Sequence, residues 1–367
     1  MTNILSTVKS GVGFITLNRP KSLNALSLEM VLELSRLLNS WKSDPSLEAV
    51  AIRGSNREGP FGHFCAGGDI RFFHEAGLAG DPKLDEFFSE EYRLNHLIFT
   101  YPKPYIAFMD GIVMGGGMGI SQGASLRIVT EGTKMAMPET GIGFFPDVGG
   151  GFFLSRCPGY LGEYLALTGQ MLLGDDAINA GLADFVSSRK LLESHWDNLG
   201  DSTIGNVSQR VLHLKSQLKN KTSEIHQAEW WDEHIDKVFA MDTVQQIIDG
   251  LAALGEGWPA KVLYDLLKRS PLMLEVTLQQ IRRGRHMKLA DDLRMERDMV
   301  RHCFQTRHLG RSGKTSETVE GIRALAVDKD RSPCWQPSRI EEVTPEMVEP
   351  FFDSPWRPNE HPLSDLD

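Results

Sequence analysis

The sequence predicts an α/β fold with a mainly helical C-terminal region, because the hydrophobic pattern changes once along the chain. Up to about residue 190, short apolar runs typical of strands alternate with stretches whose apolar residues recur at helical spacing. After about residue 200 the strand signals fade, and the amphipathic helical pattern continues. We therefore expect residues 1–200 to form an α/β core that carries the site, and residues 201–367 to form a helical region.

The elements of the first part follow in chain order. The segment TVKSGVGFITLNRP (7–20) combines β-branched and turn residues, so it predicts a β-rich beginning. The segment SLEMVLELSRLLNSW (27–41) has apolar residues at helical spacing and predicts a helix. Three further apolar runs predict strands, namely AVAIRG (49–54), PYIAFMDG (104–111) and SLRIVTE (125–131).

The second part predicts helices separated by polar or proline-containing breaks. Ser270-Pro271 and the polar run TRHLGRSGKTS (306–316) mark two such breaks. The helical segments are EWWDEHIDKVFAM (229–241), PAKVLYDLLKRS (259–270) and LADDLRMERDMVRHCF (289–304). We expect Trp230, Trp231 and Trp258 to lie in the core, where large aromatic side chains are more common than at ligands.

Composition excludes several classes of function. The chain has 367 residues and a formal net charge of −10, which argues against general binding to nucleic acids or anionic membranes but allows a local pocket for a phosphorylated ligand. No apolar run approaches the length of a membrane span, and the N-terminus lacks the apolar region of a secretory signal. We expect a cytoplasmic protein, or a mitochondrial one if a transit peptide was removed. The widely spaced Cys65, Cys157, Cys303 and Cys334 predict reduced, mostly buried thiols.

Two glycine-rich loops predict a site for a polarised oxygen. The segment GIVMGGGMGIS (111–121) places four glycines within five positions, and FCAGGDIRFF (64–73) contains a second cluster of small residues. Glycines between a strand and a helix leave backbone N–H groups unshielded, so an oxygen bearing negative charge can approach them. Two such loops could hold one carbonyl oxygen as an oxyanion hole. Taken singly, each cluster could equally be a tight turn or a site of close packing.

The segment AMPETGIGFFPDVGGGFFL (136–154) carries two candidate catalytic carboxylates, Glu139 and Asp147. Carboxylates in apolar surroundings tend to have raised pKa values, which suits acid-base chemistry near neutral pH. The alternative is that Glu139 is an ordinary carboxylate at a helix start after Pro138, and Asp147 a turn former after Pro146.

Three short motifs imitate other sites. GISQG (119–123) matches a nucleophile elbow with Ser121 as the nucleophile, but a glycine loop precedes it instead of a strand. GRSGKTS (310–316) imitates a phosphate-binding loop, although His308 stands where a glycine is required. The glycines of the chain also do not complete a dinucleotide-binding fingerprint.

The segments AGGDI, GIVMGGGMG and MPETGIGFFPDVGGG, in this order, resemble the crotonase (enoyl-CoA hydratase/isomerase) superfamily, and within it the 3-hydroxyisobutyryl-CoA hydrolase branch. The glycine loops are shared across the superfamily, whereas the MPET to PDVGGG block and the DKD-SP-W-P tail are specific to the branch. The resemblance covers nearly the whole chain and includes LNRPKSLNALS (17–27), SEEYRLN (89–95), ADDLRMERDMVRHC (290–303) and EGIRALAVDKDRSPCWQP (320–337).

The resemblance implies a spiral of β-β-α units with a helical C-terminal region, and a site for an acyl-CoA. The oxyanion hole would be formed by the backbone N–H groups of Gly68 and Gly116. Arg71 and Ala66 would contact coenzyme A. Glu91 would hold the distal hydroxyl of the substrate, although SEEYRLN could equally be a solvated helix face with interchangeable charges.

By the same resemblance, Glu139 and Asp147 would be the catalytic carboxylates, with Glu139 either attacking the thioester or activating a water. Hydratases of the superfamily carry another glutamate where this chain has Gly119, so we do not expect hydration of a double bond. The expected reaction releases coenzyme A and 3-hydroxyisobutyrate in valine breakdown, with 3-hydroxypropionyl-CoA as a second substrate, and needs no metal or separate cofactor. Superfamily members often form homo-oligomers, which leaves the assembly open.

Three alternatives stay open at this point. The chain could be a hydratase or isomerase acting on another acyl-CoA. It could also be a non-enzymatic homologue associated with mitochondrial ribosomes, against which the intact carboxylates and the acidic charge argue. The last alternative is a serine hydrolase that uses Ser121.

Overall fold

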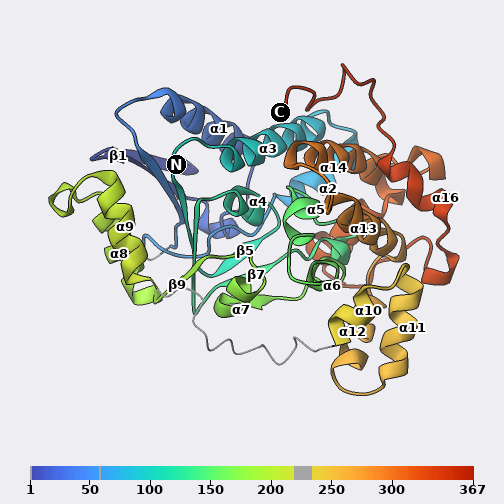
Figure 1. Cartoon of the computed structure of the whole chain (residues 1–367). Coiled ribbons are helices and arrows are strands. Elements are labelled where there is room, and N and C mark those ends of the chain that lie inside the picture. The colour runs from blue at the N-terminus through green and yellow to red at the C-terminus, as the bar shows by residue number, and fades with distance from the viewer. Residues whose placement is uncertain (1, 58, 219–233) are drawn as a thin grey trace. The chain divides into compact units, whose positions relative to one another are not determined.

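The computed structural model describes residues 2–57, 59–218 and 234–367 (Figure 1). The predicted core residues Trp230 and Trp231 lie outside this part. The chain forms two compact units that interleave along the sequence. The first unit holds residues of 1–68, 93–136 and 171–227, and the second holds residues of 69–92, 137–170 and 228–367, in each case those described. The boundary expected near residue 200 stays a prediction.

The first unit contains two β-sheets. Its strands are β1 (Ile4–Lys9), β2 (Val12–Leu17), β3 (Ala49–Gly54), β4 (Tyr105–Met109), β5 (Ile112–Met114), β6 (Leu126–Thr130), β7 (Lys134–Ala136), β8 (Leu172–Leu173) and β9 (Phe185–Ser187). One sheet has the order β1-β2-β3-β4-β6-β9, in which only the β1–β2 pair is antiparallel. The other sheet has the order β5-β7-β8. Strands β2 and β4 are buried at every position, as expected for sheet strands covered on both faces.

The chain visits the two sheets in alternation. After β4 in the larger sheet it forms β5 in the smaller sheet and then the helix α4 (Gly116–Gln122), and β6 is likewise followed by β7. Strand β3 is followed by Cys65, which makes a parallel bridge to Val113 of β5. Each turn of the chain thus contributes backbone to both sheets, which is the β-β-α repetition expected from the sequence.

Besides α4 and the second part of α3 (Lys83–Phe99), the first unit contains the helices α1 (Leu28–Ser43), α7 (Gly174–Asn179), α8 (Leu192–Leu199) and α9 (Val207–Gln217). Helix α1 begins after Ser27, whose hydroxyl accepts from the N–H of Met30 at 3.4 Å, as an N-cap residue does. Helices α8 and α9 lie side by side (Figure 1). The ring of Trp196 on α8 lies 4.9 Å from that of Phe14 on β2, so these helices close the core of the larger sheet.

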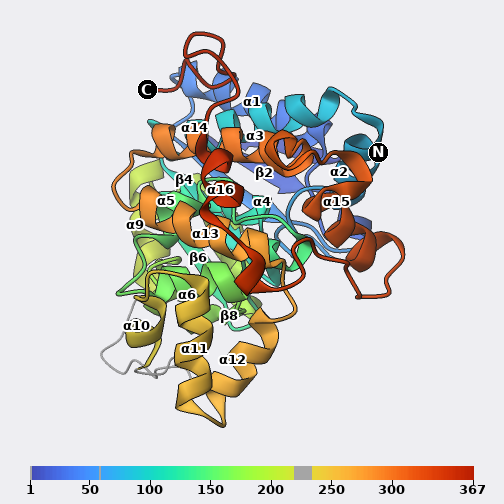
Figure 2. The ribbon, with the colours of Figure 1, turned by 90° about the vertical axis from the view of Figure 1, so that its right-hand side faces the viewer.

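The second unit is helical. Its helices are α2 (Ile70–Ala79), the first part of α3 (Lys83–Phe99), α5 (Gly150–Leu154), α6 (Leu161–Thr168), α10 (His234–Phe239), α11 (Val244–Leu254), α12 (Trp258–Leu266), α13 (Pro271–Gly284), α14 (Leu289–Phe304), α15 (Glu317–Ile322) and α16 (Pro345–Val348). Helix α13 packs against α5 and α6, and α14 packs against α5 and α15 (Figure 2). This packing places α5, which directly follows the Asp147 loop, against both α13 and α14.

The sequence predictions for individual elements are largely confirmed. The runs 49–54, 104–111 and 125–131 contain β3, β4 and β6, and the segment 289–304 coincides with α14. Of the segment 229–241, residues 234–239 form α10.

The remaining side-chain predictions concern tryptophan and cysteine. The ring of Trp258 lies 5.9 Å from that of Tyr164, which fits a packing role. Three cysteines are buried free thiols and Cys334 is exposed. In the part of the chain that is described, no helix is both long and apolar enough to cross a membrane.

Candidate active site

The two glycine loops lie against each other within the first unit. The N–H of Cys65 donates to the carbonyl of Ile112 at 3.0 Å, and the N–H of Met114 donates back to the carbonyl of Cys65 at 3.0 Å. A Cβ atom on Gly67, which has a φ of +100°, would lie 3.3 Å from the carbonyl oxygen of Met114 and 3.6 Å from the nitrogen of Gly116. The loops predicted to form an oxyanion hole are therefore adjacent.

The glycines of these loops have different roles. A Cβ atom on Gly117 would lie 2.4 Å from the carbonyl oxygen of Cys65, so this glycine is required by close packing. Gly116 is the first residue of α4, and neither its N–H nor that of Gly68 donates a hydrogen bond to any described residue. Gly116 is buried and Gly68 is half-buried, and an oxyanion hole formed by their N–H groups stays a prediction.

Three other residues of these loops were singled out by the sequence. The N–H of Ala66 donates to the carbonyl of Leu23 at 3.1 Å and is already used by the fold. Gly119 is buried within α4, where it leaves no carboxylate. The hydroxyl of Ser121 is also buried in α4 and donates to the carbonyl of Gly117 at 2.8 Å, which is the bond of a packed helical serine and not of a nucleophile.

The predicted carboxylates lie together in the second unit. Glu139 begins a 3-10 helix (Glu139–Ile142) after Pro138 and is 7% exposed, and Asp147 is 6% exposed. Glu91 on α3 is only 2% exposed, so the alternative of a solvated helix face is wrong for this residue. Glu91 Oε1 and Glu139 Oε2 are buried and have no hydrogen-bond partner among the described residues. These two oxygens can therefore accept a donor from a bound molecule.

Burial raises the pKa of all three carboxyl groups, and repulsion by neighbouring carboxylates adds to the rise for Glu139 and Glu91. Burial raises the pKa of Glu139, and the charge of Asp147 adds to this, while Arg269 opposes it. Burial, followed by the charges of Asp147 and Glu139, raises the pKa of Glu91. Burial raises the pKa of Asp147 to about 7, although a hydrogen bond from Tyr92 works in the opposite direction. A carboxyl that titrates near neutral pH can both accept and return a proton.

Two residues that the sequence did not indicate complete this cluster. The hydroxyl of Tyr92 donates to Oδ2 of Asp147 at 2.8 Å and stabilises its ionised form. The guanidinium of Arg269 is buried, donates to Oγ1 of Thr140 at 2.7 Å, and acts electrostatically on Glu139. Its position next to Glu91 was the only indication in the sequence that Tyr92 belongs to this cluster.

The loop that carries Asp147 is held by side chains of α13 and α14. Glu296 accepts from the N–H groups of Gly149 and Gly151 at 2.7 and 2.9 Å. Gln280 donates to Oε1 of Glu296 at 3.0 Å and to the carbonyl of Pro146 at 2.6 Å. These bonds fix the backbone on both sides of Asp147.

The same loop contains backbone conformations that are costly on their own. Val148 has a φ of +56° and Gly149 a φ of +88°, and a β-branched residue rarely adopts the left-handed region. A Cβ atom on Gly151 would lie 2.3 Å from Oδ1 of Asp292, and Oδ2 of the same residue accepts from the N–H of Phe152 at 2.9 Å. Such strain persists only where the surrounding structure over-determines the backbone, as α13 and α14 do here.

Arg71, predicted to contact coenzyme A, lies exposed at the start of α2. It forms no ion pair with any described residue. Its role toward coenzyme A stays a prediction.

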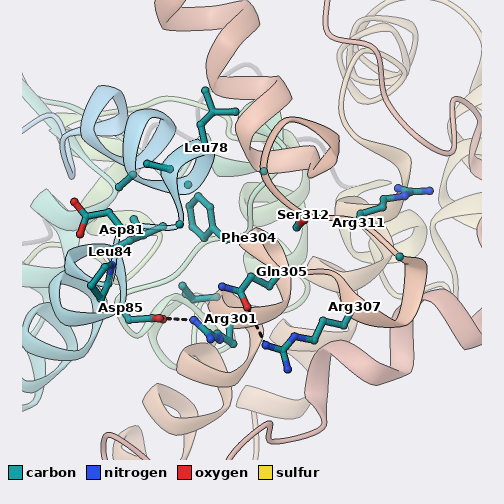
Figure 3. Close-up of a pocket in the computed structure, with 18 residues that line it drawn as sticks. Leu78, Asp81, Leu84, Asp85, Arg301, Phe304, Gln305, Arg307, Arg311 and Ser312 are labelled. Atoms are coloured by element: carbon teal, nitrogen blue, oxygen red, sulfur yellow. Dashed lines mark hydrogen bonds and ion pairs between the residues drawn. The ribbon is translucent and has the colours of Figure 1, made fainter.

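Two cavities are lined by residues other than those of the carboxyl cluster. One, of 740 Å³, lies in the second unit between the ends of α2 and α14 and the start of α3 (Figure 3). Phe304 and Arg307 line it, and Arg301 pairs there with Asp85. The other, of 460 Å³, lies in the first unit and has the basic residues Lys21, Arg57 and Arg189 in its wall. The residues that line these cavities include none of the residues predicted for the site.

Comparisons with known proteins agree with the fold and give it a family. The sequence profile of the enoyl-CoA hydratase/isomerase family matches residues 12–352. The chain is 39% identical over 353 residues to the mitochondrial 3-hydroxyisobutyryl-CoA hydrolase of Gallus gallus, covering 95% of this chain and 88% of the relative. It is 41% identical over 345 residues to the enzyme of the same name from Danio rerio, covering 93% and 87%.

A solved structure of a carnitinyl-CoA dehydratase from Mycobacterium thermoresistibile has a TM-score of 0.84 to this chain at 37% identity, covering 96% of this chain and 97% of the other. The expected crotonase-like fold is confirmed.

Replacing Tyr92 with phenylalanine should raise the pKa of Asp147 above about 7, because the hydrogen bond that favours its ionised form is lost. The measurement is a ¹³C NMR titration of the aspartate carboxyl carbons, with Asp147→Asn to assign the signal. Tyr105→Phe is the matched control, since the buried hydroxyl of Tyr105 has no partner among the described residues. An unchanged titration in Tyr92→Phe would contradict the role of this hydrogen bond.

Replacing Glu296 with alanine should lower the free energy of unfolding by about 3 kcal/mol or more, because two buried N–H groups lose their acceptor. Chemical denaturation measures the loss, and the exposed Glu341→Ala serves as the control. A loss no greater than that of the control would show that Glu296 does not hold the loop.

Proposed function

The chain belongs to the enoyl-CoA hydratase/isomerase family, and we propose that it is a thioester hydrolase that converts 3-hydroxyisobutyryl-CoA to the free acid and coenzyme A. The relatives from Gallus gallus and Danio rerio, whose names state this activity, support the proposal over nearly the whole chain. The observation that carries it is the buried pair Glu139 and Asp147, with Asp147 hydrogen-bonded by Tyr92. The reaction belongs to valine catabolism, and 3-hydroxypropionyl-CoA is proposed as a second substrate.

In the proposed reaction, the thioester oxygen accepts from the N–H groups of Gly68 and Gly116. These donors are unpaired among the described residues, which supports the assignment. The carbonyl oxygen gains negative charge as the carbon becomes tetrahedral, and fixed donors stabilise that charge more than the neutral carbonyl. Such donors lower the barrier to attack on the thioester.

Glu139 and Asp147 are proposed to carry out attack and proton transfer. Glu139 either attacks the carbonyl carbon and forms an anhydride that water then hydrolyses, or it removes a proton from a water that attacks directly. In both routes the carbon–sulfur bond breaks and the thiolate leaves. Asp147, whose pKa is raised to about 7 by burial, then exchanges protons with Glu139, the water and the departing sulfur.

Substrate contacts are proposed for Glu91, Arg71 and Ala66. Glu91 would accept from the distal hydroxyl of the acyl group, and its buried, unpaired Oε1 supports this role. Arg71 would bind the phosphates of coenzyme A, since its guanidinium is exposed and has no carboxylate partner among the described residues. Ala66 would line the path of coenzyme A.

The remaining proposals concern the cofactor, the cellular location and the assembly of the protein. The substrate is a small acyl-CoA, and coenzyme A is part of that substrate, so no separate cofactor or metal is assigned. The relatives carry the word mitochondrial in their names, whereas a bacterial-type chain of this kind would act in the cytoplasm. Neither nucleic acid nor a membrane is proposed as a partner, and a homo-oligomer stays open.

A second candidate is hydration or dehydration of an acyl-CoA, because the structural neighbour from Mycobacterium thermoresistibile is named a dehydratase. Gly119 argues against it, since this position in α4 supplies no second carboxylate. Crotonyl-CoA separates the two candidates, because a hydratase consumes its double bond whereas a hydrolase of 3-hydroxyacyl thioesters leaves the double bond intact.

Thiol release from purified protein should be fast with 3-hydroxyisobutyryl-CoA and 3-hydroxypropionyl-CoA, and slow with acetyl-CoA and crotonyl-CoA. Glu139→Gln and Asp147→Asn should each lower kcat about 100-fold or more, because each removes a group that transfers protons or attacks the carbonyl. The exposed Glu341→Gln is the control. Absence of thiol release from every thioester would overturn the hydrolase proposal.

The rate of thiol release should fall on the acidic side of a pKa near 7. Burial raises the pKa of Asp147 to about 7, so below that pH its carboxyl is protonated and no longer accepts a proton. A profile of kcat/KM between pH 5 and 9 measures this limb. In Tyr92→Phe this acidic fall of kcat/KM should move to higher pH. A fall at the same pH as in the parent protein would show that Asp147 is not the group whose protonation limits the rate.

A further inference from the structure

The backbone between Glu139 and Asp147 passes through Gly143, which is buried and has a φ of +66°. A Cβ atom on Gly143 would lie 2.3 Å from the carbonyl oxygen of Glu317 and 3.0 Å from Cζ3 of Trp335. The start of α15 and the indole of the C-terminal tail therefore lie directly against the segment that joins the two carboxylates. Only glycine fits at this point.

A second contact makes this packing specific. The hydroxyl of Thr318, on the first turn of α15, is buried and donates to the carbonyl of Gly143 at 2.7 Å. One turn further along α15, a Cβ atom on Gly321 would lie 2.3 Å from the carbonyl carbon of Ile142. Helix α15 thus follows the backbone of residues 142 and 143 and holds it by one side-chain hydrogen bond.

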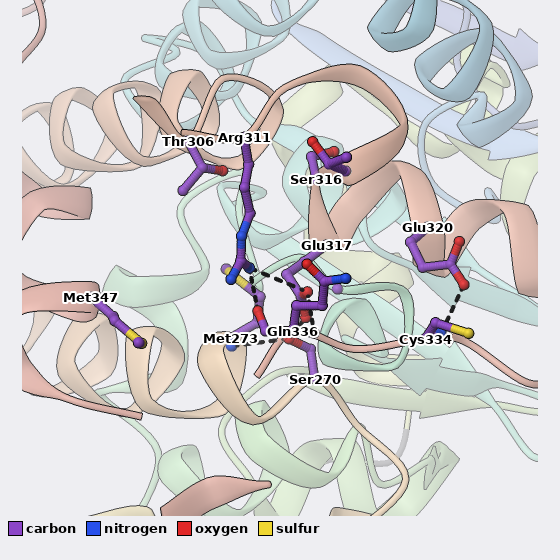
Figure 4. A network of polar contacts seen from close by, with 12 residues as sticks. Ser270, Met273, Thr306, Arg311, Ser316, Glu317, Glu320, Cys334, Gln336 and Met347 are labelled. Carbon is purple, nitrogen blue, oxygen red and sulfur yellow. Dashed lines mark hydrogen bonds and ion pairs between the residues drawn. The ribbon is translucent and has the colours of Figure 1, made fainter. Parts of the chain in front are cut away.

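The position of α15 is fixed in turn by a polar network around Glu317 (Figure 4). Its carboxylate accepts from the hydroxyl of Ser270, from the N–H of Gln336 at 2.8 Å, and lies 3.8 Å from the guanidinium of Arg311. Ser270 is also the N-cap of α13, since it accepts from the N–H of Met273 at 3.2 Å. One carboxylate therefore joins α13, α15 and the tail.

The tail itself is held by four further interactions with this side of the unit. The N–H of Cys334 donates to Glu320 at 2.7 Å, and the indole N–H of Trp335 donates to the carbonyl of Lys268 at 2.9 Å. Arg323 binds the carboxylates of Asp328 and Asp330 at 2.6 and 2.7 Å, which shapes the turn before Cys334. The DKD-SP-W-P segment of the tail, which was noted in the sequence, is therefore folded against α15.

We propose that residues 316–336 are the support that sets the positions of Glu139 and Asp147, with Thr318 as the positioning residue that joins this support to Gly143. The inference rests on the proposed function for the role of the two carboxylates. Thr318 touches neither carboxylate and acts through the backbone between them. Displacement of reacting groups by about 1 Å can cost about 100-fold in rate, so a single bond in this place has catalytic weight.

The test compares Thr318→Val with Thr318→Ser. Valine has the shape of threonine but no hydroxyl, so the carbonyl of Gly143 loses its donor, whereas serine keeps the donor. Thr277→Val is the matched control, since the buried hydroxyl of Thr277 on α13 has no partner among the described residues. Two readouts are used: steady-state thiol release from 3-hydroxyisobutyryl-CoA, and hydrogen exchange of the amides of residues 142–145 in the resting protein.

We expect Thr318→Val to lower kcat about 10- to 100-fold with KM changed less than about threefold, and to speed exchange at residues 142–145. Thr318→Ser should restore both readouts to near the parent, and Thr277→Val should leave both unchanged. Unchanged exchange in Thr318→Val would overturn the support itself, and faster exchange with an unchanged kcat would overturn its positioning role. A parent protein that releases no thiol would refute the proposed function, and the exchange readout would then decide the support alone.

Discussion

The burial of acidic side chains with little opposing charge is the constraint on which the second unit depends. Moving a carboxylate out of water is costly unless donors replace the lost hydration. The unit meets this cost in two ways. Glu296 accepts backbone N–H groups with both oxygens and Asp292 with one, whereas Glu91 and Glu139 each keep one oxygen without a partner among the described residues. The bonds of Glu296 and Asp292 hold the loop that follows Asp147.

The glycines divide in the same manner between packing and chemistry. At Gly117, Gly143 and Gly321, backbone atoms of other segments lie so close to the position of a Cβ atom that no larger residue fits. Gly68 and Gly116 instead present N–H groups that no described residue accepts. Some glycines of these motifs are therefore required by close packing, whereas others have an N–H group without an acceptor among the described residues.

Local pattern was enough to predict the long elements and to indicate the carboxylates Glu91, Glu139 and Asp147, which are buried in the structure. Buried parallel strands such as β3 appear as continuous apolar runs, and the long helix α14 has a clear apolar face. The strands of the smaller sheet are two or three residues long and show no periodicity. The choice between Glu90 and Glu91 could have been made from helix phase, because Glu91 follows Phe87 and Phe88 by four and three positions on the buried face of α3.

Tyr92, Arg269 and Glu296 could not be predicted in this way, since each acts on a partner 55 or more residues away.

The interleaving of the two units has a consequence for synthesis of the chain. Asp85, close to Glu91 on α3, pairs with Arg297, 212 residues later, and the Asp147 loop waits for Glu296, which is 147 residues beyond Gly149. On the ribosome, the bonds that hold the Asp147 loop can therefore form only after most of the chain has been synthesised. The raised pKa values of Glu139 and Asp147 come from burial, so they belong to the folded chain and not to its unfolded segments.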